Sequence, residues 1–334
     1  MTEPNTESGI RGILIRGVGG LYGVRPLPLA AGDGVLLCRA RGVFRHENIS
    51  PLPGDEVICL PSGSDDTANR GAAYVIDRIL PRKNSLLRPP LANLTHLFLV
   101  IPAARPEPDL RTADALLSVA EANGIAPVVL VTKRDLAPAR AEEICSLYAG
   151  AGYPAFTLSS ADAASVDALR AFIVSLAADG ATVTASFAGA SGAGKSTLMT
   201  KLFPQHTFKT GDVSRKTERG RQTTRHVELF PFEADGSVCL IADTPGFSLL
   251  DFTQYNALDT AALPDTFPEF RPYLGQCRYT KCTHTKEEGC AILAAVRAGT
   301  VSPARHESYR AMFDECKKTP DWKRRRMERN DRHG

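Results

Sequence analysis

No run of apolar residues in this sequence approaches the roughly twenty that a membrane-spanning helix needs. The first residues, MTEPNTESG, are polar and lack the apolar segment of a secretory signal peptide. The net charge is only +3 over 334 residues, so charge alone favours no class of partner. These absences favour a cytoplasmic protein without a membrane partner, and the length predicts two or three domains.

Disulfides are not expected in a reducing compartment, so the eight cysteines need another explanation. Four stand singly in apolar stretches and are expected to be small buried side chains: Cys38, Cys59, Cys145 and Cys239. Three others, Cys277, Cys282 and Cys290, cluster with His284, and Cys316 stands alone near the end of the chain. Three thiolates and one imidazole form a closed tetrahedral ligand set. The cluster therefore predicts one structural Zn²⁺, the alternative being free cysteines beside a surface histidine.

A glycine-rich stretch at 189–196 has the spacing G-x-x-x-x-G-K-S of a phosphate-binding P-loop. It follows an apolar, β-branched segment and precedes a helical one, so backbone N–H groups and the helix dipole would face the phosphates. Lys195 is expected to reach the β- and γ-phosphates, and the Ser196 hydroxyl to bind Mg²⁺. The predicted nucleotide-binding residues are Gly189, Ala190, Ser191, Gly192, Ala193, Gly194, Lys195, Ser196 and Thr197. The alternative is an ordinary glycine-rich loop.

Upstream, Thr132-Lys133-Arg134-Asp135 stands at the end of an apolar segment, where open α/β sheets place their ligands. A carboxylate such as Asp135 can accept hydrogen bonds from guanine N1–H and the 2-amino group, a donor pair that adenine lacks. The next apolar segment ends at Ser159-Ser160-Ala161, a second base-reading stretch from which Ser160 and Ala161 join the predicted base site. Alone the motif is weak, since Lys133 and Asp135 could be a surface pair. Beside a P-loop it favours GTP or GDP.

The remaining phosphate-side elements are expected downstream of the P-loop. Thr223 and Thr224, in a polar and basic stretch, supply hydroxyls for Mg²⁺. The apolar segment 238–242 ends at Asp243-Thr244-Pro245-Gly246, where Asp243 suits Mg²⁺ and the Gly246 amide suits a γ-phosphate oxygen. Base-reading elements thus precede phosphate elements, which reverses the usual order in GTPases. A circular permutation explains the reversal.

The N-terminal region predicts short strands between glycine or proline turns. Five are expected, at 12–16, 21–24, 35–40, 55–60 and 74–79. Five short strands favour a small barrel, and the OB-fold is the most common five-stranded choice. Arginines are frequent here (Arg11, Arg16, Arg25, Arg39, Arg41, Arg45, Arg70 and Arg78), and they suit either an RNA-binding surface or a solvated face.

Residues 82–90, RKNSLLRPP, are expected to form a linker because of their charge and proline pair. Beyond it, strand and helix patterns alternate. Strands are expected at 97–101, 128–131, 155–158, 182–188, 227–232 and 238–242, and helices at 109–123, 142–149, 165–178 and 196–203. This alternation predicts a parallel α/β sheet with helices on both faces.

Two helices are expected after the metal cluster, at 291–298 and around 306–316. The chain then ends in a basic run that contains Trp322, its single tryptophan. The basic residues are Lys317, Lys318, Lys323, Arg324, Arg325, Arg326, Arg329 and Arg332. Such a run suits contact with RNA or a solvated tail, and the two agree if the tail orders on binding.

Together these motifs resemble the RsgA (YjeQ) family of circularly permuted GTPases. The resemblance rests on the barrel, the permuted order, the P-loop, the D-T-P-G-F stretch at 243–247 and the C-x4-C-x-H-x5-C cluster. It implies an OB-fold RNA-binding domain with linker at 1–84, a permuted GTPase domain at 85–260 and a mainly α zinc-binding domain at 261–334. It also implies GTP hydrolysis stimulated by the small (30S) ribosomal subunit, in late maturation of that subunit, with rRNA as partner. A monomer is the simplest expectation.

Two positions depart from the family's usual pattern. Thr132 stands where the family usually has asparagine; it keeps a hydroxyl but loses an amide, which is expected to lower nucleotide affinity. Gln222 stands where the family typically has histidine, and an amide can position water but cannot act as a base. Phe247 replaces the water-orienting glutamine of many GTPases, so unaided hydrolysis is expected to be slow. The expected catalytic set is Lys195, Gln222, Thr223, Thr224, Asp243 and Gly246, with Mg²⁺ on Ser196 and on Thr224 or Thr223.

Two other functions fit parts of the sequence. An ATP-using P-loop enzyme, such as a small-molecule kinase, would prefer adenine, and Asp135 argues against it. A nucleotide-gated RNA-binding module would bind GTP with little or no turnover, and Gln222 and Phe247 fit that function. Turnover of GTP and ATP, measured with and without small ribosomal subunits, distinguishes the three.

Overall fold

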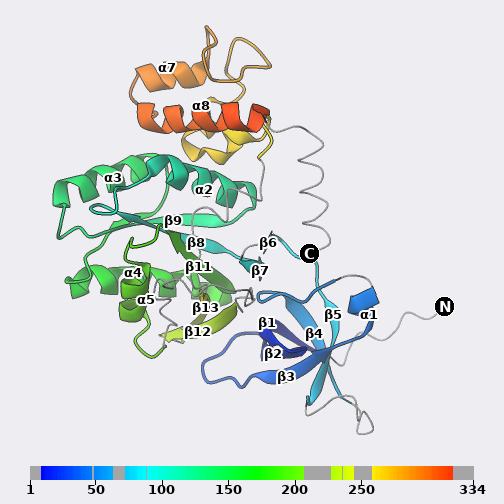
Figure 1. The fold of residues 1–334 in the computed structure, drawn as a ribbon. Helices are drawn as coiled ribbons and strands as arrows, with labels where there is room; N and C mark the ends of the chain where they lie inside the picture. Colours follow the sequence, from blue (N-terminus) through cyan, green and yellow to red (C-terminus); the bar gives the residue numbers. More distant parts are fainter. Residues whose placement is uncertain are drawn as a thin grey trace, which may run out of the picture.

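The computed structural model describes residues 9–46, 49–62, 72–87, 89–206, 227–234, 236–243 and 258–318. A small barrel, a central α/β sheet and a helical unit follow one another along the chain, and the α/β sheet lies between the other two (Figure 1). Across these described ranges, no helix combines the length and apolarity needed to cross a membrane.

Five strands close the N-terminal barrel: β1 (Ile10–Val18), β2 (Leu21–Pro26), β3 (Leu36–Ala40), β4 (Glu56–Pro61) and β5 (Tyr74–Ile79). The short helix α1 (Val43–His46) follows β3. The strand order is β1-β2-β3-β5-β4, and the β3–β5 pair is parallel while the others are antiparallel. Alternate side chains point inward, so Leu14, Val24, Cys38, Val57, Cys59 and Ile76 form the core. The predicted five-stranded barrel is confirmed.

The expected linker at 82–90 is partly a strand hairpin. β6 (Ser85–Leu87) pairs antiparallel with β7 (Pro90–Ala92), and Leu86 and Leu91 are buried. Gly54 explains the tight fit against the barrel, because a Cβ at Gly54 would lie 1.9 Å from the carbonyl oxygen of Ala92. The proline pair suggested an open connection, but proline is tolerated at the start of a strand, where Pro90 stands.

The central sheet has the strand order β10-β9-β8-β11-β13-β12. Its strands are β8 (His96–Pro102), β9 (Ala126–Thr132), β10 (Ala155–Thr157), β11 (Val183–Gly189), β12 (Glu228–Ala234) and β13 (Ser237–Asp243). All neighbouring pairs are parallel except β12 with β13, which is antiparallel. The expectation of a parallel sheet is therefore wrong for this edge strand. The reason is the connection at 235–236, which is too short for a crossover helix.

Helices cover both faces of the sheet, as predicted (Figure 1). On one face, α2 (Leu110–Ala122) and α3 (Pro138–Gly150) share an apolar cluster with Leu97, Leu99 and Val129. On the other, α4 (Ala163–Leu176) and α5 (Lys195–Leu202) pack with Phe98, Val100 and Val128. The alternation of these strand residues places the two clusters on opposite faces. A short 3-10 helix, η2 (Ala178–Gly180), follows α4. Cys239 is buried as expected, whereas Cys145 is only half-buried.

The C-terminal unit consists of η3 (Leu263–Thr266), η4 (Pro268–Tyr273), α7 (Ala291–Arg297) and α8 (Pro303–Lys318). Its small core is aromatic, with Phe267, Phe270 and Tyr309 in mutual ring contact. α8 begins three residues before the expected start, at Pro303, which is a favoured residue in a first helical turn.

A buried cluster around Arg305 joins α8 to α2. The Arg305 guanidinium donates to Asp114 Oδ1 on α2 at 2.7 Å and to the two oxygens of Glu269 on η4 at 2.7 and 3.2 Å. It lies 4.6 Å from the ring centroid of Phe267, and the Tyr148 hydroxyl donates to Asp114 Oδ1 at 3.0 Å. Burial would lower the pKa of Arg305, but Asp114 and Glu269 outweigh it and raise the pKa well above its ordinary value. The helical unit is therefore fixed to the α/β domain by charge as well as by packing.

Candidate nucleotide site and metal centre

The P-loop stretch connects β11 to α5, as its spacing predicts. Gly189 ends β11 and Gly194 caps α5. A Cβ at Gly189 would lie 2.4 Å from the carbonyl oxygen of Val100 on the neighbouring strand. Gly192 and Gly194 have φ of 76° and 96°, a backbone region that L side chains rarely adopt. The sequence therefore needs glycine here for steric reasons, and the result is a turn that exposes backbone amides at a helix N-terminus.

Lys195 lies across its own loop. Its Nζ donates to the carbonyl oxygens of Gly189 at 2.6 Å and Ala190 at 2.8 Å. Burial lowers the pKa of the Lys195 ammonium. Ser191, Ser196 and Thr197 are exposed on the rim of the same turn, while Ala193 is buried beneath it. The loop thus presents a cation, backbone amides and hydroxyls together, which are the groups that bind phosphate and its magnesium ion.

The predicted base-reading residues contact the P-loop directly. The Thr132 hydroxyl, buried at the end of β9, donates to the carbonyl oxygen of Ala193 at 2.6 Å. Lys133 Nζ donates to the carbonyl oxygen of Gly192 at 2.8 Å and also to that of Arg105. Residues that lie some sixty positions apart in the sequence are therefore linked side by side. Thr132, which lacks the amide of asparagine, still bridges the two loops through its hydroxyl.

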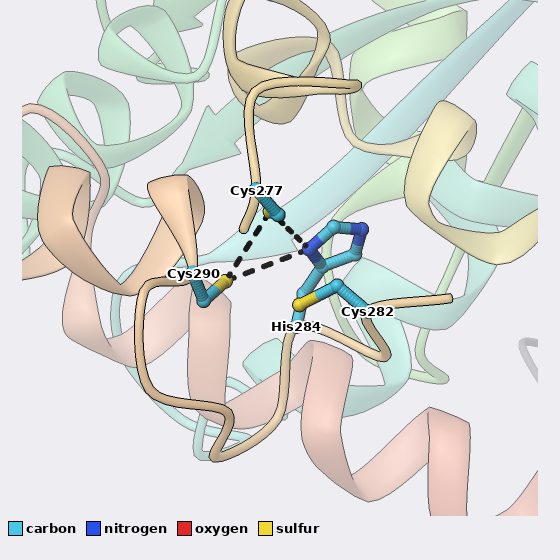
Figure 2. A group of neighbouring side chains, drawn as sticks. All are labelled: Cys277, Cys282, His284 and Cys290. Atoms are coloured by element: carbon cyan, nitrogen blue, oxygen red, sulfur yellow. Dashed lines mark hydrogen bonds between the residues drawn. The ribbon is translucent and has the colours of Figure 1, made fainter. Parts of the chain in front are cut away.

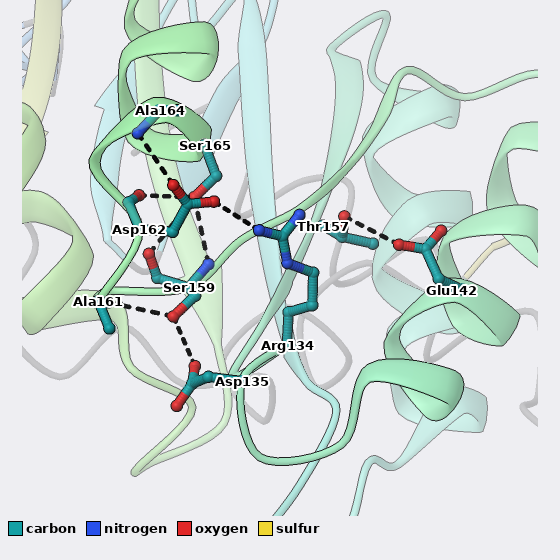
Figure 3. Close-up of polar contacts among 9 residues, drawn as sticks. All are labelled: Arg134, Asp135, Glu142, Thr157, Ser159, Ala161, Asp162, Ala164 and Ser165. Carbon is teal, nitrogen blue, oxygen red and sulfur yellow. Dashed lines mark hydrogen bonds and ion pairs between the residues drawn. The ribbon is translucent and has the colours of Figure 1, made fainter.

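Asp135 is oriented by Ser159, which lies in the predicted base-reading stretch 159–161 but is not among the residues predicted to bind the nucleotide. The Ser159 hydroxyl donates to Asp135 Oδ1 at 2.6 Å and accepts the backbone N–H of Ala161 at 3.1 Å (Figure 3). Ser159 is buried, whereas the predicted residues Ser160 and Ala161 are exposed. Two adjacent serines cannot be told apart from their letters alone, but only the first reaches the carboxylate.

Arg134 turns away from Asp135. Its guanidinium forms an ion pair with Asp162, the residue that caps the N-terminus of α4 by accepting from the Ala164 amide (Figure 3). The ion pair ties the loop after β9 to the start of α4. Arg134, predicted as a nucleotide-binding residue, thus engages the protein itself and braces the loop that carries Asp135.

Several predicted switch residues lie outside the described part of the chain. These are Gln222, Thr223, Thr224 and Gly246, together with Phe247. Asp243 ends β13, whose neighbour β11 leads into the P-loop, but its side chain is not among those described. The backbone of β13 thus runs toward the same edge of the sheet as the P-loop strand.

The four predicted zinc ligands converge in the C-terminal unit. Their ligand atoms all lie within 4.8 Å of one another (Figure 2). Cys277 Sγ and Cys290 Sγ are 3.8 Å apart, and they lie 3.4 and 3.5 Å from His284 Nδ1. Tetrahedral bonds of about 2.3 Å to sulfur and 2.0–2.1 Å to nitrogen would separate two sulfurs by about 3.8 Å and sulfur from nitrogen by about 3.5 Å. The arrangement therefore fits a single zinc ion.

Backbone and side-chain contacts hold these ligands in place. The Ala291 and Leu293 amides donate to Cys277 Sγ at 3.3 Å and Cys290 Sγ at 3.5 Å. Behind them, the His306 ring contacts the His284 carbonyl oxygen through Nε2 at 2.8 Å. Such second contacts set the orientation of metal ligands. His306 follows Arg305, so the metal cluster and the buried arginine cluster share one stretch of α8.

The ligand loop is also closed by Glu287. Burial would raise the pKa of Glu287, but hydrogen bonds from the Thr283 hydroxyl and nearby amides outweigh it, and the pKa falls to about 2. The carboxylate accepts the Thr283 and Thr285 amides at 2.9 and 3.0 Å. A charged Glu287 therefore fixes the turn on both sides of His284.

Comparison with known proteins agrees with this architecture. The family model for the RsgA GTPase matches residues 79–253, and that for the RsgA N-terminal domain matches residues 11–67. Small ribosomal subunit biogenesis GTPase RsgA of Ruminiclostridium cellulolyticum is 34% identical over 320 residues, covering 95% of this chain and 97% of that protein. The protein of the same name from Enterococcus faecalis is 39% identical over 275 residues, covering 81% and 85%.

Two solved structures have the same overall arrangement. The crystal structure of YjeQ from Thermotoga maritima matches with a TM-score of 0.75 at 28% identity, over 93% of this chain and all of that one. The structure of YloQ, described as a circularly permuted GTPase, matches with a TM-score of 0.72 at 31% identity, over 96% and 99%. The permuted order read from the motifs is thus found in a solved relative.

Proposed function

Because the chain belongs to the RsgA family of GTPases, we propose that it hydrolyses GTP to GDP and phosphate in the biogenesis of the small ribosomal subunit. The observation that carries the proposal is the junction of two loops. Thr132 and Lys133, at the end of β9, both bond the P-loop backbone. A ligand that fills both loops must present a base and phosphates at a fixed separation, as a nucleoside triphosphate does.

Guanine is the base that the site favours. Asp135 can accept two hydrogen bonds from the N1–H and the 2-amino group, and Ser159 holds its carboxylate by donating to Oδ1 at 2.6 Å. Adenine offers no such pair of donors, so the Asp135 carboxylate would gain neither hydrogen bond from it. This preference argues against an ATP-using kinase.

Hydrolysis in such a site is mostly positioning and charge stabilisation. Lys195 would neutralise charge on the β- and γ-phosphates. Mg²⁺, when bound, supplies further charge neutralisation, and Ser196 with Thr224 or Thr223 would hold it. Asp243, Gly246 and Gln222 complete the proposed catalytic set. Since Gln222 cannot act as a base, we expect unaided turnover to be slow.

The partner that speeds this turnover is proposed to be the small (30S) ribosomal subunit, met through its rRNA. Exposed arginines on the barrel, such as Arg11, Arg41 and Arg78, suit phosphate contact. The zinc ion is proposed to be structural, because Cys277, Cys282, His284 and Cys290 leave no open coordination position. We further propose a cytoplasmic monomer with domains at 1–84, 85–260 and 261–334.

The test is GTP turnover by the purified full chain, with and without purified small ribosomal subunits, with ATP in parallel. Slow hydrolysis of GTP, strongly raised by subunits, with ATP ignored, is the expected result. Hydrolysis of ATP would favour the kinase. Binding of GTP without turnover, even with subunits present, would favour the nucleotide-gated RNA-binding module. Lys195→Ala serves as the control that abolishes turnover.

A further inference from the structure

The hairpin formed by β12 and β13 joins the segment expected to bind Mg²⁺ to the segment expected to contact the γ-phosphate. Its first strand begins four residues after Thr224, and its second ends three residues before Gly246. Seven residue pairs hold the two strands together, from Glu228–Asp243 to Ala234–Ser237. β13 in turn pairs with β11, which leads into the P-loop. The hairpin is therefore a stiff connection between the two predicted switch segments.

The barrel packs against this hairpin. Ile13 and Ile15 on β1 share an apolar cluster with Leu229 on β12 and with Leu240 and Ala242 on β13. Leu27 and Leu29, from the loop after β2, pack at its margin. Figure 1 shows the barrel beside the β12 edge of the sheet. A displacement of the hairpin would therefore have to move the barrel or expose apolar surface.

A half-buried ion pair strengthens the contact at the far end of β12. The Arg25 side chain, 3% exposed, pairs with Glu233 Oε1 and also donates to the carbonyl oxygen of Ala30 at 2.7 Å. The second carboxylate oxygen of Glu233 accepts the Gly32 amide at 3.2 Å. One carboxylate on the hairpin is thus held by the end of β2 and by the loop that follows it. Glu233 remains 34% exposed, so water can replace its partners if the contact opens.

We propose that the barrel senses the nucleotide state through this Arg25–Glu233 clamp, an inference that rests on the proposed GTP site. Binding of a γ-phosphate would engage Thr224 and Gly246, which flank the hairpin in the sequence, and packing of the barrel holds the hairpin itself. Each event lowers the cost of the other, so occupancy at the P-loop and docking of the barrel reinforce one another. By reciprocity, a partner that fixes the barrel would raise the affinity for GTP over GDP.

The test compares the wild-type full chain with Arg25→Met, which keeps the length of the side chain but removes its charge. Affinities for GDP and for a non-hydrolysable GTP analogue are measured with fluorescent nucleotides. We expect Arg25→Met to weaken binding of the GTP analogue by about fivefold or more, the lower range of allosteric coupling, and to change GDP affinity by less than about twofold. In the wild type, amide exchange in β1 and β2 should differ between the two nucleotides, and in Arg25→Met this difference should disappear.

Glu228→Gln is the matched control. Glu228 lies on the same strand and pairs with Arg16 of the barrel at 3.2 Å, but both side chains are about half exposed. The Glu228→Gln variant should bind both nucleotides with the affinities of the wild type. Glu233→Gln removes the charge of Arg25's partner but keeps an acceptor for the Gly32 amide. It therefore tests whether the effect of Arg25→Met comes from the lost ion pair or from a folding defect. Equal affinity changes for both nucleotides, or none, would overturn the clamp. A wild type that binds no guanine nucleotide would instead overturn the proposed function.

Discussion

Two buried arginines hold the central domain to its neighbours, and their surroundings differ. Arg305 is 1% exposed, and its partners Asp114 and Glu269 are 3% and 4% exposed. Arg25 is equally buried, but its partner Glu233 is 34% exposed. Removing Arg305 would strand two carboxylates away from water, whereas removing Arg25 leaves one carboxylate that water can reach. The free energy of separation is therefore much larger on the side of the metal cluster.

The difference indicates a division of roles between the two interfaces. The helical unit sits on α2 and α3, on the face of the sheet away from α5, and its contact is sealed by charge and aromatic rings. The barrel sits on the β12–β13 hairpin, whose two ends lead to the predicted switch segments. A fully buried contact suits an interface that stays fixed. A contact that is partly exposed to water suits an interface that breaks and re-forms.

Loss of zinc should have the largest effect, because it destabilises the helical unit on the side of the Arg305 cluster and leaves the barrel interface intact. Structural zinc contributes on the order of 10 kcal/mol in small zinc domains. With a strong chelator, or in Cys290→Ser, we expect residues 258–318 to lose protection from amide exchange. His306, which contacts the His284 carbonyl at 2.8 Å, should transmit the loss to Arg305. Amide exchange followed by mass spectrometry measures it.

The barrel is the internal control for that experiment. Within the part of the chain that the structure describes, its strands share no predicted ligand and no apolar cluster with the metal unit, so their exchange should stay within error of the untreated protein. A helical unit that keeps its protection after the metal has been removed would show that the aromatic core, and not the cluster, holds it together.

Arg305→Met ranks next. It leaves Asp114 and Glu269 buried without a cation, and breaking a buried pair in this way costs about 3–5 kcal/mol. The Tyr148 hydroxyl would still donate to Asp114 and recover a small part. We expect a clear fall in the thermal unfolding temperature, with α2 and α8 losing protection first. Arg310→Met is the control, since Arg310 and Glu307 form an exposed pair on the same helix. If both variants lowered the unfolding temperature equally, burial of the Arg305 ion pairs would make no contribution to stability.

Ser159→Ala changes the nucleotide site and should leave both interfaces intact. The Asp135 carboxylate would lose a hydrogen bond worth about 1.5–3 kcal/mol for a charged acceptor, so GTP affinity should fall by about tenfold or more. Preference for GTP over inosine triphosphate, which lacks the 2-amino group, should also narrow. Competition binding measures both. Ser160→Ala, at the exposed neighbour, should change neither; a matching loss there would return the role to the serine first predicted.

The two interfaces also differ in how far the sequence predicts them. Spacing alone predicted the strand–turn–helix at 189–196 and the cluster of Cys277, Cys282, His284 and Cys290, because such motifs are local and their chemistry fixes the residue types. The barrel and the alternation of strands and helices along the α/β domain followed from periodicity and turns, whereas the order of the strands in the sheet was not predicted. The antiparallel edge strand β12 was not predicted either, since strand direction depends on a connection too short to carry a pattern of its own.

Sequence patterns could not predict which side chains far apart in the chain pair with one another. Arg305 and Asp114 are 191 positions apart, and Arg25 and Glu233 are 208 apart. Nothing in the sequence distinguishes a buried arginine from the many exposed ones. The choice between Ser159 and Ser160 depends on which side chain faces Asp135. Pairings of this kind are set by packing, so the sequence could place the sites but not the contacts between domains.

The smallest effect is expected at the exposed pair between Arg16 and Glu228, which bridges the barrel and β12 at 3.2 Å. Water screens both charges, and exposed pairs contribute about 0–1 kcal/mol. Glu228→Gln should therefore change the urea midpoint of the barrel by little more than the experimental error, and high salt should erase even that difference. If Glu228→Gln lowered the urea midpoint as much as Glu233→Gln does, solvent exposure would not explain a difference between the two ion pairs. The interface would then rest on a row of surface charges along β12, and the contrast with the sealed Arg305 cluster would lose its physical basis.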